Sequence, residues 1–194
     1  MSRIIVDAVR NSSASADGIT LASDGSVTLP GNATCSGTAT GFGGGKLLQV
    51  VSTTKTDTAS TSTSGSFTDV SGMSVSITPS STSSKIFIII SLGTVSSAQG
   101  IAVAFKLLRG STAVGNTAGS DAYAGFSTFY GGGGTGDEYM LSGSHNFLDS
   151  PSTTSSTTYK LQWRNSGGTS YLGRYHGSVL YQGSSTITAM EIAA

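Results

Sequence analysis

Residues 76–90 read SITPSSTSSKIFIII, a polar tract broken by Pro79 that leads into five consecutive apolar residues, Ile86 to Ile90. A half-exposed strand alternates apolar and polar side chains, and an amphipathic helix repeats every three to four residues, so neither pattern fits this run. A short continuous apolar run is typical of a strand covered on both faces. We therefore expect it either at the centre of a β-sandwich or where one subunit packs against another, and the sequence leaves both open.

The segments around this run alternate as half-buried strands do, for example MSVSIT at 73–78 and YKLQWR at 159–164. No segment sustains a 3.6-residue period for three turns, while β-branched and aromatic runs recur between Gly, Ser, Asn and Asp. The sequence therefore predicts an all-β protein built around an antiparallel, jelly-roll-like β-sandwich. Strands are expected at 3–9, 18–22, 26–30, 46–56, 66–70, 73–79, 84–93, 101–109, 122–130, 138–148, 156–165, 170–175, 177–182 and 185–193.

The spacing of these segments changes near Gly43-Gly44-Gly45, where we place a domain boundary. Residues 46–194 carry most of the large apolar side chains, enough for one sandwich domain. Residues 1–45 carry too few to enclose a core within one chain. Three copies wound together could bury them against one another, which predicts a homotrimer. The side chains expected in that shared core are Ile4, Val6, Ile19, Leu21, Val27 and Leu29.

Composition excludes several classes of protein. The chain of 194 residues is 37% hydrophobic and only 10% charged, with a formal net charge of zero, so we expect it to fold and to present polar, uncharged surfaces. Its basic residues are scattered, which argues against nucleic-acid binding. The N-terminus has no apolar core of the kind a secretory signal requires, and no run approaches the roughly 18 residues of a membrane span. We expect synthesis in the cytoplasm.

Residues suited to catalysis or metal binding are sparse. His145 and His176 belong to no metal-ligand spacing, and the single Cys35 lacks basic neighbours that would make it reactive. The stretch TGFGGGKLL lacks the first glycine and the Ser or Thr of a phosphate-binding loop. The adjacent pair Asp137 and Glu138 points to opposite faces of a strand and does not make a glycosidase site. We expect neither an enzyme nor a cofactor.

Aromatic residues beside glycine and serine turns are the best candidates for ligand binding. Sugars and cell-surface receptors commonly stack on aromatic rings, while hydroxyls and amides supply hydrogen bonds. The same rings could instead belong to the core, and the sequence leaves this alternative open. The candidates lie in two regions, 119–136 and 166–178, and are Tyr123, Phe126, Tyr130, Tyr171, Tyr175 and His176.

Three blocks of the sequence resemble a known family. The opening SRIIVDAVRNSSAS and GITLASDGSVTLPG are similar to the N-terminal segment of tailed-bacteriophage fibre and virion appendage proteins. The block from Gly45 to Ile90 resembles the start of their C-terminal domain, with GKLLQVV, FTD, ITPS and SKI in order. The ending LYQGSSTITAMEIAA resembles their terminal strand with Met-Glu-Ile. The resemblance covers 1–92 and 178–192.

This resemblance implies a virion structural protein, a homotrimer whose N-terminal segment attaches to the particle and whose C-terminal sandwich faces the host. The positions matching the attachment motif are Ile4, Val6, Asp7 and Asn11. The implied partners are other virion proteins of the tail, baseplate or capsid, and a host-surface glycan or outer-membrane component. The implied location is the virion, after synthesis in the host cytoplasm. The chain lacks the long shaft of usual tail fibres, which leaves the attachment point open.

Three functions are compatible with these features of the sequence. The first is a tail fibre that recognises the host surface and brings about adsorption. The second is a capsid decoration protein, or head fibre, that stabilises the particle without binding a receptor. The third, a tailspike-type depolymerase, is disfavoured because the sequence has no parallel β-helix repeat.

Overall fold

The structure of the chain is a computed structural model, and it describes residues 7–9, 12, 19–28, 46–119, 121–132 and 139–194. The chain separates into two compact units, residues 1–42 and 43–194. Every regular element among the described residues is a β-strand, and the strand pairings there are antiparallel. This confirms the all-β prediction. None of the described residues forms a helix capable of crossing a membrane.

The N-terminal unit contains β1 (Ala8–Val9), β2 (Ile19–Leu21) and β3 (Val27–Thr28), which form a three-stranded antiparallel sheet. Val9, Leu21 and Val27 are exposed in the single chain, so these strands enclose no core of their own. Of the attachment candidates, Asp7 is exposed, and its backbone carbonyl accepts a 2.9 Å hydrogen bond from the Leu21 N–H. The other three, Ile4, Val6 and Asn11, and the boundary at 43–45, lie outside the described residues. The domain boundary stays a prediction.

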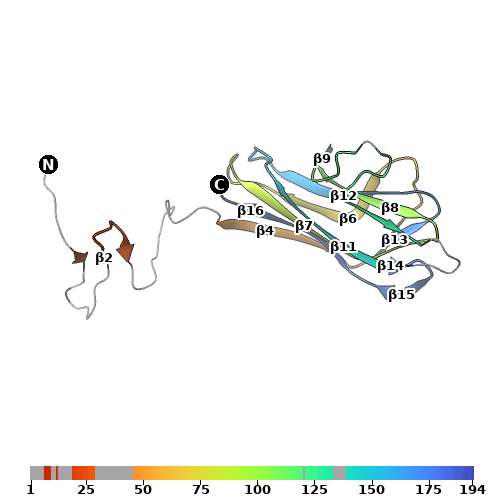
Figure 1. The fold of residues 1–194 in the computed structure, drawn as a ribbon, viewed down its shortest axis with the longest axis horizontal. Coiled ribbons are helices and arrows are strands. Elements are labelled where there is room, and N and C mark those ends of the chain that lie inside the picture. Colours follow the sequence, from red (N-terminus) through yellow and green to blue (C-terminus); the bar gives the residue numbers. More distant parts are fainter. Residues whose placement is uncertain (1–6, 10–11, 13–18, 29–45, 120, 133–138) are drawn as a thin grey trace. The chain divides into compact units, whose positions relative to one another are not determined.

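The C-terminal unit is a sandwich of two main sheets with a small hairpin (Figure 1). Its strands are β4 (Leu47–Lys55), β5 (Ala59–Thr61), β6 (Thr68–Ile77), β7 (Lys85–Ser97), β8 (Ala102–Arg109), β9 (Thr112–Ala113), β10 (Ser127–Tyr130), β11 (Leu141–Asp149), β12 (Thr157–Asn165), β13 (Ser170–Leu172), β14 (Arg174–Tyr175), β15 (Ser178–Gln182) and β16 (Ser185–Ile192). One sheet has the order β10-β8-β12-β6, with β9 beside β8. The other has the order β4-β16-β7-β13-β5, with β11 also paired to β7.

β7 is the central strand of the six-stranded sheet, paired to β11 along one side and to β16 and then β13 along the other. Its inward side chains Ile86, Ile88 and Ile90 are fully buried. The alternate side chains Phe87 and Ile89 face the outside of the sheet and are only half-buried. The alternative that places the run at the centre of the β-sandwich is therefore confirmed, but its outward side chains are only half-covered within the described part of the chain. The second sheet of the sandwich supplies one cover, and nothing in the described part of the chain fully covers the other face.

Most other predicted strands agree with the structure to within one or two residues. The strands expected at 66–70 and 73–79 are one strand, β6, which runs through Gly72 at φ 78° where its register with β12 shifts. The strand expected at 122–130 is reduced to β10, and that at 170–175 is two short strands, β13 and β14. The short strands β5 and β9 were not predicted.

The core lies between the two main sheets. Its largest fully buried side chains include Tyr159, Phe105, Met73 and Leu161. Trp163 is also buried, with its ring 6.0 Å from that of Phe105. Burial of such side chains contributes roughly 1.5–3 kcal/mol each, which makes this core the main source of stability.

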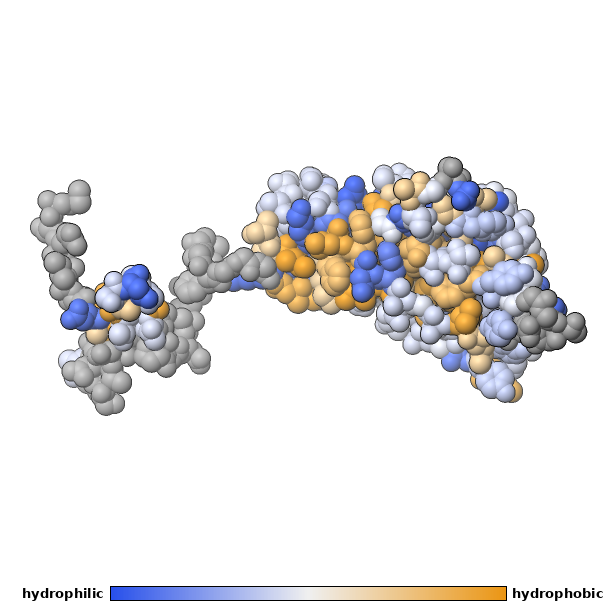
Figure 2. Space-filling view, in the orientation of Figure 1, coloured by the Kyte–Doolittle hydropathy of each residue, from blue (hydrophilic) through white to orange (hydrophobic). Residues whose placement is uncertain are grey.

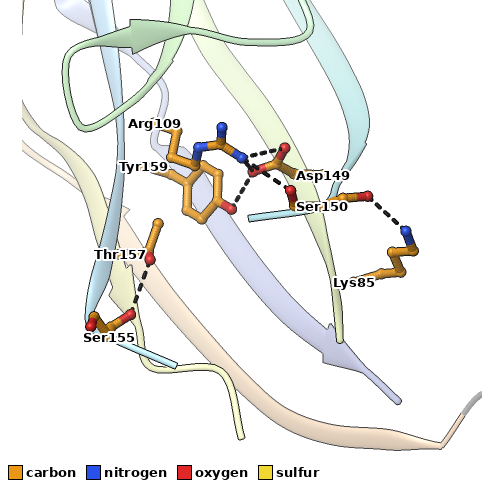
Figure 3. A network of polar contacts seen from close by, with 7 residues as sticks. All are labelled: Lys85, Arg109, Asp149, Ser150, Ser155, Thr157 and Tyr159. Atoms are coloured by element: carbon orange, nitrogen blue, oxygen red, sulfur yellow. Dashed lines mark hydrogen bonds and ion pairs between the residues drawn. The ribbon is translucent and has the colours of Figure 1, made fainter. Parts of the chain in front are cut away.

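A polar network links the two sheets at one edge of the core (Figure 3). Asp149, on β11, accepts a 2.6 Å hydrogen bond from the buried Tyr159 hydroxyl of β12 and two hydrogen bonds, of 2.9 and 2.8 Å, from Arg109 Nη1 of β8. Burial raises the pKa of Tyr159, and the Asp149 carboxylate raises it further. The tyrosine therefore stays a neutral donor. Next to it, Lys85 Nζ donates a 2.8 Å hydrogen bond to Ser150 Oγ.

Candidate functional site

The β14–β15 hairpin leaves the six-stranded sheet at two glycines. Gly173, at φ 87°, ends β13, and its N–H donates a 2.7 Å hydrogen bond to the Thr94 carbonyl of β7. The Gly183 N–H closes the hairpin with a 3.2 Å hydrogen bond to the Gly173 carbonyl. A left-handed φ favours glycine, and a Cβ at Gly173 would lie 3.0 Å from the Asp57 carbonyl oxygen. The hairpin base is therefore fixed in place while its tip extends from the sheet.

Arg174 organises the first strand of this hairpin. Its guanidinium lies over the Tyr171 ring at 4.2 Å from the centroid. Nε and Nη2 each donate a 3.2 Å hydrogen bond, to the carbonyls of Tyr175 and His176 respectively. The Arg174 carbonyl in turn accepts a 2.8 Å hydrogen bond from Ser96 Oγ on β7. One arginine thus connects the sheet, the ring and the turn.

Aromatic and aliphatic side chains gather on the hairpin. Tyr171 and His176 meet edge to face at 5.6 Å, and Tyr175 and Tyr181 do so at 6.1 Å. The exposed fraction is 56% for Tyr181 and 83% for Leu180. Exposed rings with hydroxyls at their edges can stack on an apolar surface and also form hydrogen bonds. The aromatic cluster formed by Tyr171 of β13 and the β14–β15 hairpin is therefore the candidate binding site.

The structure brings together three of the six predicted binding residues, Tyr171, Tyr175 and His176. Arg174 and Tyr181 complete the cluster. Sequence reasoning did not select them, although the aromatic spacing of the LGRYHGSVLY stretch could have indicated Tyr181. The role of Arg174 depends on two carbonyls whose positions become known only with the fold.

The other three predicted residues belong to other elements. Tyr123 lies under the Arg164 guanidinium, 4.9 Å from its ring centroid. Tyr130 ends β10 and is 53% exposed. Phe126 packs against the core, with its ring 6.4 Å from Phe105 and stacked at 4.6 Å on His145. The Phe126 side chain is thus used mainly in packing.

A second polar cluster joins motifs from two of the three blocks that carry the family resemblance. The buried Glu191 carboxylate, from the Met-Glu-Ile motif, accepts hydrogen bonds from the Ser80 N–H at 2.7 Å and the Ser80 hydroxyl at 2.6 Å. Gln49 Nε2 donates to the other carboxylate oxygen at 2.6 Å and to the Thr78 carbonyl at 2.7 Å. Residues from GKLLQVV, ITPS and MEI therefore meet at one end of the sandwich.

This cluster determines the charge of Glu191. Burial by itself raises the pKa of a carboxyl group, but the hydrogen bonds from Gln49 and Ser80 outweigh that effect and lower the pKa of Glu191 to about 2. The carboxylate is thus ionised and holds the loop after β6 against the ends of β4 and β16. The arrangement is structural, since all its donors come from the chain itself.

Neither a pocket nor a group of three or more potential metal ligands occurs among the described residues. His145 lies on β11 beneath the Phe126 ring, and burial lowers its pKa.

No protein-family model matches the chain, and a search of curated proteins finds no similar sequence. Among solved structures, it is similar to the VP2 subviral particle of infectious bursal disease virus, at 15% identity and a TM-score of 0.41, over 75% of this chain and 41% of that one. A structure of the Gt strain of the same virus matches at 16% identity and a TM-score of 0.39, over 92% of this chain and 47% of the other. The chain spans less than half the length of these structures, and similarity at this level does not transfer a function.

Proposed function

We propose that the protein is a structural component of a tailed-bacteriophage virion, a fibre that contacts the host surface through its β14–β15 hairpin. The observation that carries the proposal is the aromatic cluster from Tyr171 to Tyr181, in which Tyr181 is exposed and the other rings are half-buried, and which is fixed at its base by Gly173 and Arg174. The sequence resemblance supports the virion role, and motifs from two of its three blocks meet around Glu191. The fibre is a homotrimer attached to the particle through residues 1–45.

The ligand proposed for the hairpin is a host-surface glycan or an outer-membrane component. The Tyr181 ring, which is 56% exposed, offers an apolar face for a sugar ring, and its hydroxyl can form hydrogen bonds. Arg174 is already engaged with two backbone carbonyls, so its role is to position the turn. The protein binds its ligand without changing it chemically.

Competition for adsorption tests the proposal. Excess purified protein should reduce adsorption of the phage that carries it, and the double variant Tyr175→Ala, Leu180→Ser should lose at least tenfold in potency. Tyr139→Ala removes an aromatic ring that is 48% exposed elsewhere and serves as the matched control. If the wild type and the double variant compete equally well, the hairpin is not the binding site.

The second candidate is a capsid decoration protein. It is favoured by the sequence of residues 1–194, which carries no collagen-like or coiled-coil repeat of the kind that forms a long shaft. Immunogold labelling of intact virions separates the two. Gold at the tail supports the fibre, whereas gold distributed over the head supports decoration.

A further inference from the structure

The outward face of the six-stranded sheet carries an apolar surface at the end where β4 begins. Strand register places four side chains in one row across four strands: Leu148, Phe87, Met190 and Val50. The neighbouring register adds Ile192 and Leu47. We call these six residues the outer face. Figure 2 shows hydrophobic residues gathered over β4, β7 and β16 at this end of the sandwich.

These side chains remain accessible in the single chain. Leu47, Val50 and Leu148 are 56%, 49% and 53% exposed, while Phe87 and Met190 are half-buried. The next row along this face is mostly polar, since Asn146, Thr188 and Ser52 flank the half-buried Ile89. The hydroxyls of Ser52 and Thr188 are linked by a 2.8 Å hydrogen bond. An apolar row of this kind across four adjacent strands is a feature of contact surfaces, whereas apolar residues scattered singly need no explanation.

We propose that the outer face is the contact surface between copies of this chain. The first argument is charge. The row carries no charged side chain, so two copies can approach without like-charge repulsion. The one cation in the adjacent register, Lys85, lies opposite Ile192, and its ammonium group donates to Ser150. Two copies of a charged surface repel each other, whereas two copies of an uncharged apolar surface can pack together.

The second argument is size. Four strands spaced about 4.8 Å apart are about 19 Å wide, and two rows of same-face side chains cover about 13 Å along the strands, which gives a surface of roughly 250 Å². A stable interface needs about 800 Å² from each partner. The outer face therefore provides about a third of a self-sufficient contact, which suits chains already held together by another segment.

The third argument is continuity along the chain. Residues 1–45 lead directly into β4, which begins with Leu47 and Leu48 on this surface. A segment that brings copies together would present their outer faces to one another at high local concentration. The number of copies, three, rests on the proposed function, but the surface itself does not.

The test compares variants of the full-length chain. In a Cys35→Ser background, Ser52→Cys places one thiol on the sheet face and Ser178→Cys places one on the hairpin. We expect light scattering to give a multiple of the 19.5 kDa monomer mass. We also expect maleimide to label the Ser52→Cys thiol at least tenfold more slowly than the Ser178→Cys thiol. Adding Val50→Lys and Leu148→Lys should restore fast labelling, because buried ammonium groups oppose the contact.

A Leu180→Lys variant, with its charge on the hairpin, is the matched control and should change neither mass nor labelling at Ser52→Cys. Fast labelling in the unmodified oligomer, or labelling unaffected by the two lysines, would overturn the proposal. Slow labelling with the mass of one chain would overturn it as well, since a segment of the same chain would then cover the face. Immunogold location and adsorption competition do not depend on Val50 or Leu148, so failure here leaves the proposed function standing.

Discussion

Replacing Glu191 with Gln tests the cluster that joins the GKLLQVV, ITPS and MEI motifs. The carboxylate accepts three hydrogen bonds, two from Ser80 and one from Gln49. The drop in the pKa of Glu191 from 4.5 to about 2 corresponds to roughly 3 kcal/mol at ~1.4 kcal/mol per unit. Because Ser80 is exposed and water screens part of this interaction, we expect the substitution to lower the free energy of unfolding by about 2 kcal/mol at pH 7.

The sign of the pH dependence follows from the lowered pKa. A carboxyl group with a lower pKa in the folded state stabilises the fold fully above its unfolded value, and this contribution disappears as the pH falls through the folded value. The free energy of unfolding of the wild type should therefore decrease between about pH 5 and pH 2, as Glu191 becomes protonated. The Glu191→Gln variant should not show this decrease. The two free energies of unfolding should converge near pH 2.

Guanidinium unfolding of the full-length chain at fixed protein concentration, repeated from pH 7 to pH 2.5, measures both effects. Asp69→Asn is the control, because that carboxylate pairs with Lys160 on an exposed sheet face, where the Asp69 side chain is 54% exposed. It should lower the free energy of unfolding by less than about 1 kcal/mol. The reasoning fails if Glu191→Gln has the same effect at pH 2.5 as at pH 7, or if it has no more effect than the control.

Three further predictions concern the sheets and the hairpin. Ile88→Ala should lower the free energy of unfolding by roughly 2–5 kcal/mol, and Ile89→Ala on the half-buried face should lower it less, both measured by chemical denaturation. Tyr159→Phe removes the buried donor to Asp149 and should lower that free energy by about 1.5–3 kcal/mol, as followed by thermal unfolding. Gly173→Ala should strain the hairpin base at φ 87° and speed amide exchange in 174–182, while exchange in the core strands stays unchanged.

The strand pattern was largely predictable because it is local. Alternation in stretches such as 73–78 and 159–164 comes from the two faces of a single strand, and turn residues mark where strands end. The short strands β5 and β9 are not predictable from the sequence, because two or three residues are too few to show the alternation of a strand. The two parts of β6 appeared separate because Gly72 resembles a turn in sequence, whereas in the structure it allows one strand to continue through a register shift.

The candidate site was predictable only in part. Tyr171, Tyr175 and His176 were selected because they lie near glycine, and Gly173 does begin an exposed hairpin. Phe126 also lies next to a glycine, Gly125, but this glycine has another role. A Cβ there would collide with the backbone carbonyl of Phe105, so the glycine allows close packing of two chain segments. The adjacent Phe126 accordingly packs against the core.

The continuous apolar run from Ile86 to Ile90 indicated two apolar faces, and this is what β7 has. What a single sequence cannot specify is which molecule covers the second face. The neighbours of Phe87 on that face are Leu148, Met190 and, one strand further, Val50, which lie on three other strands and join in one row only through the strand register. β7 is central in its sheet, and the described part of the chain leaves this row half-exposed. The contact between copies that we propose for the outer face would supply the cover that the run lacks there.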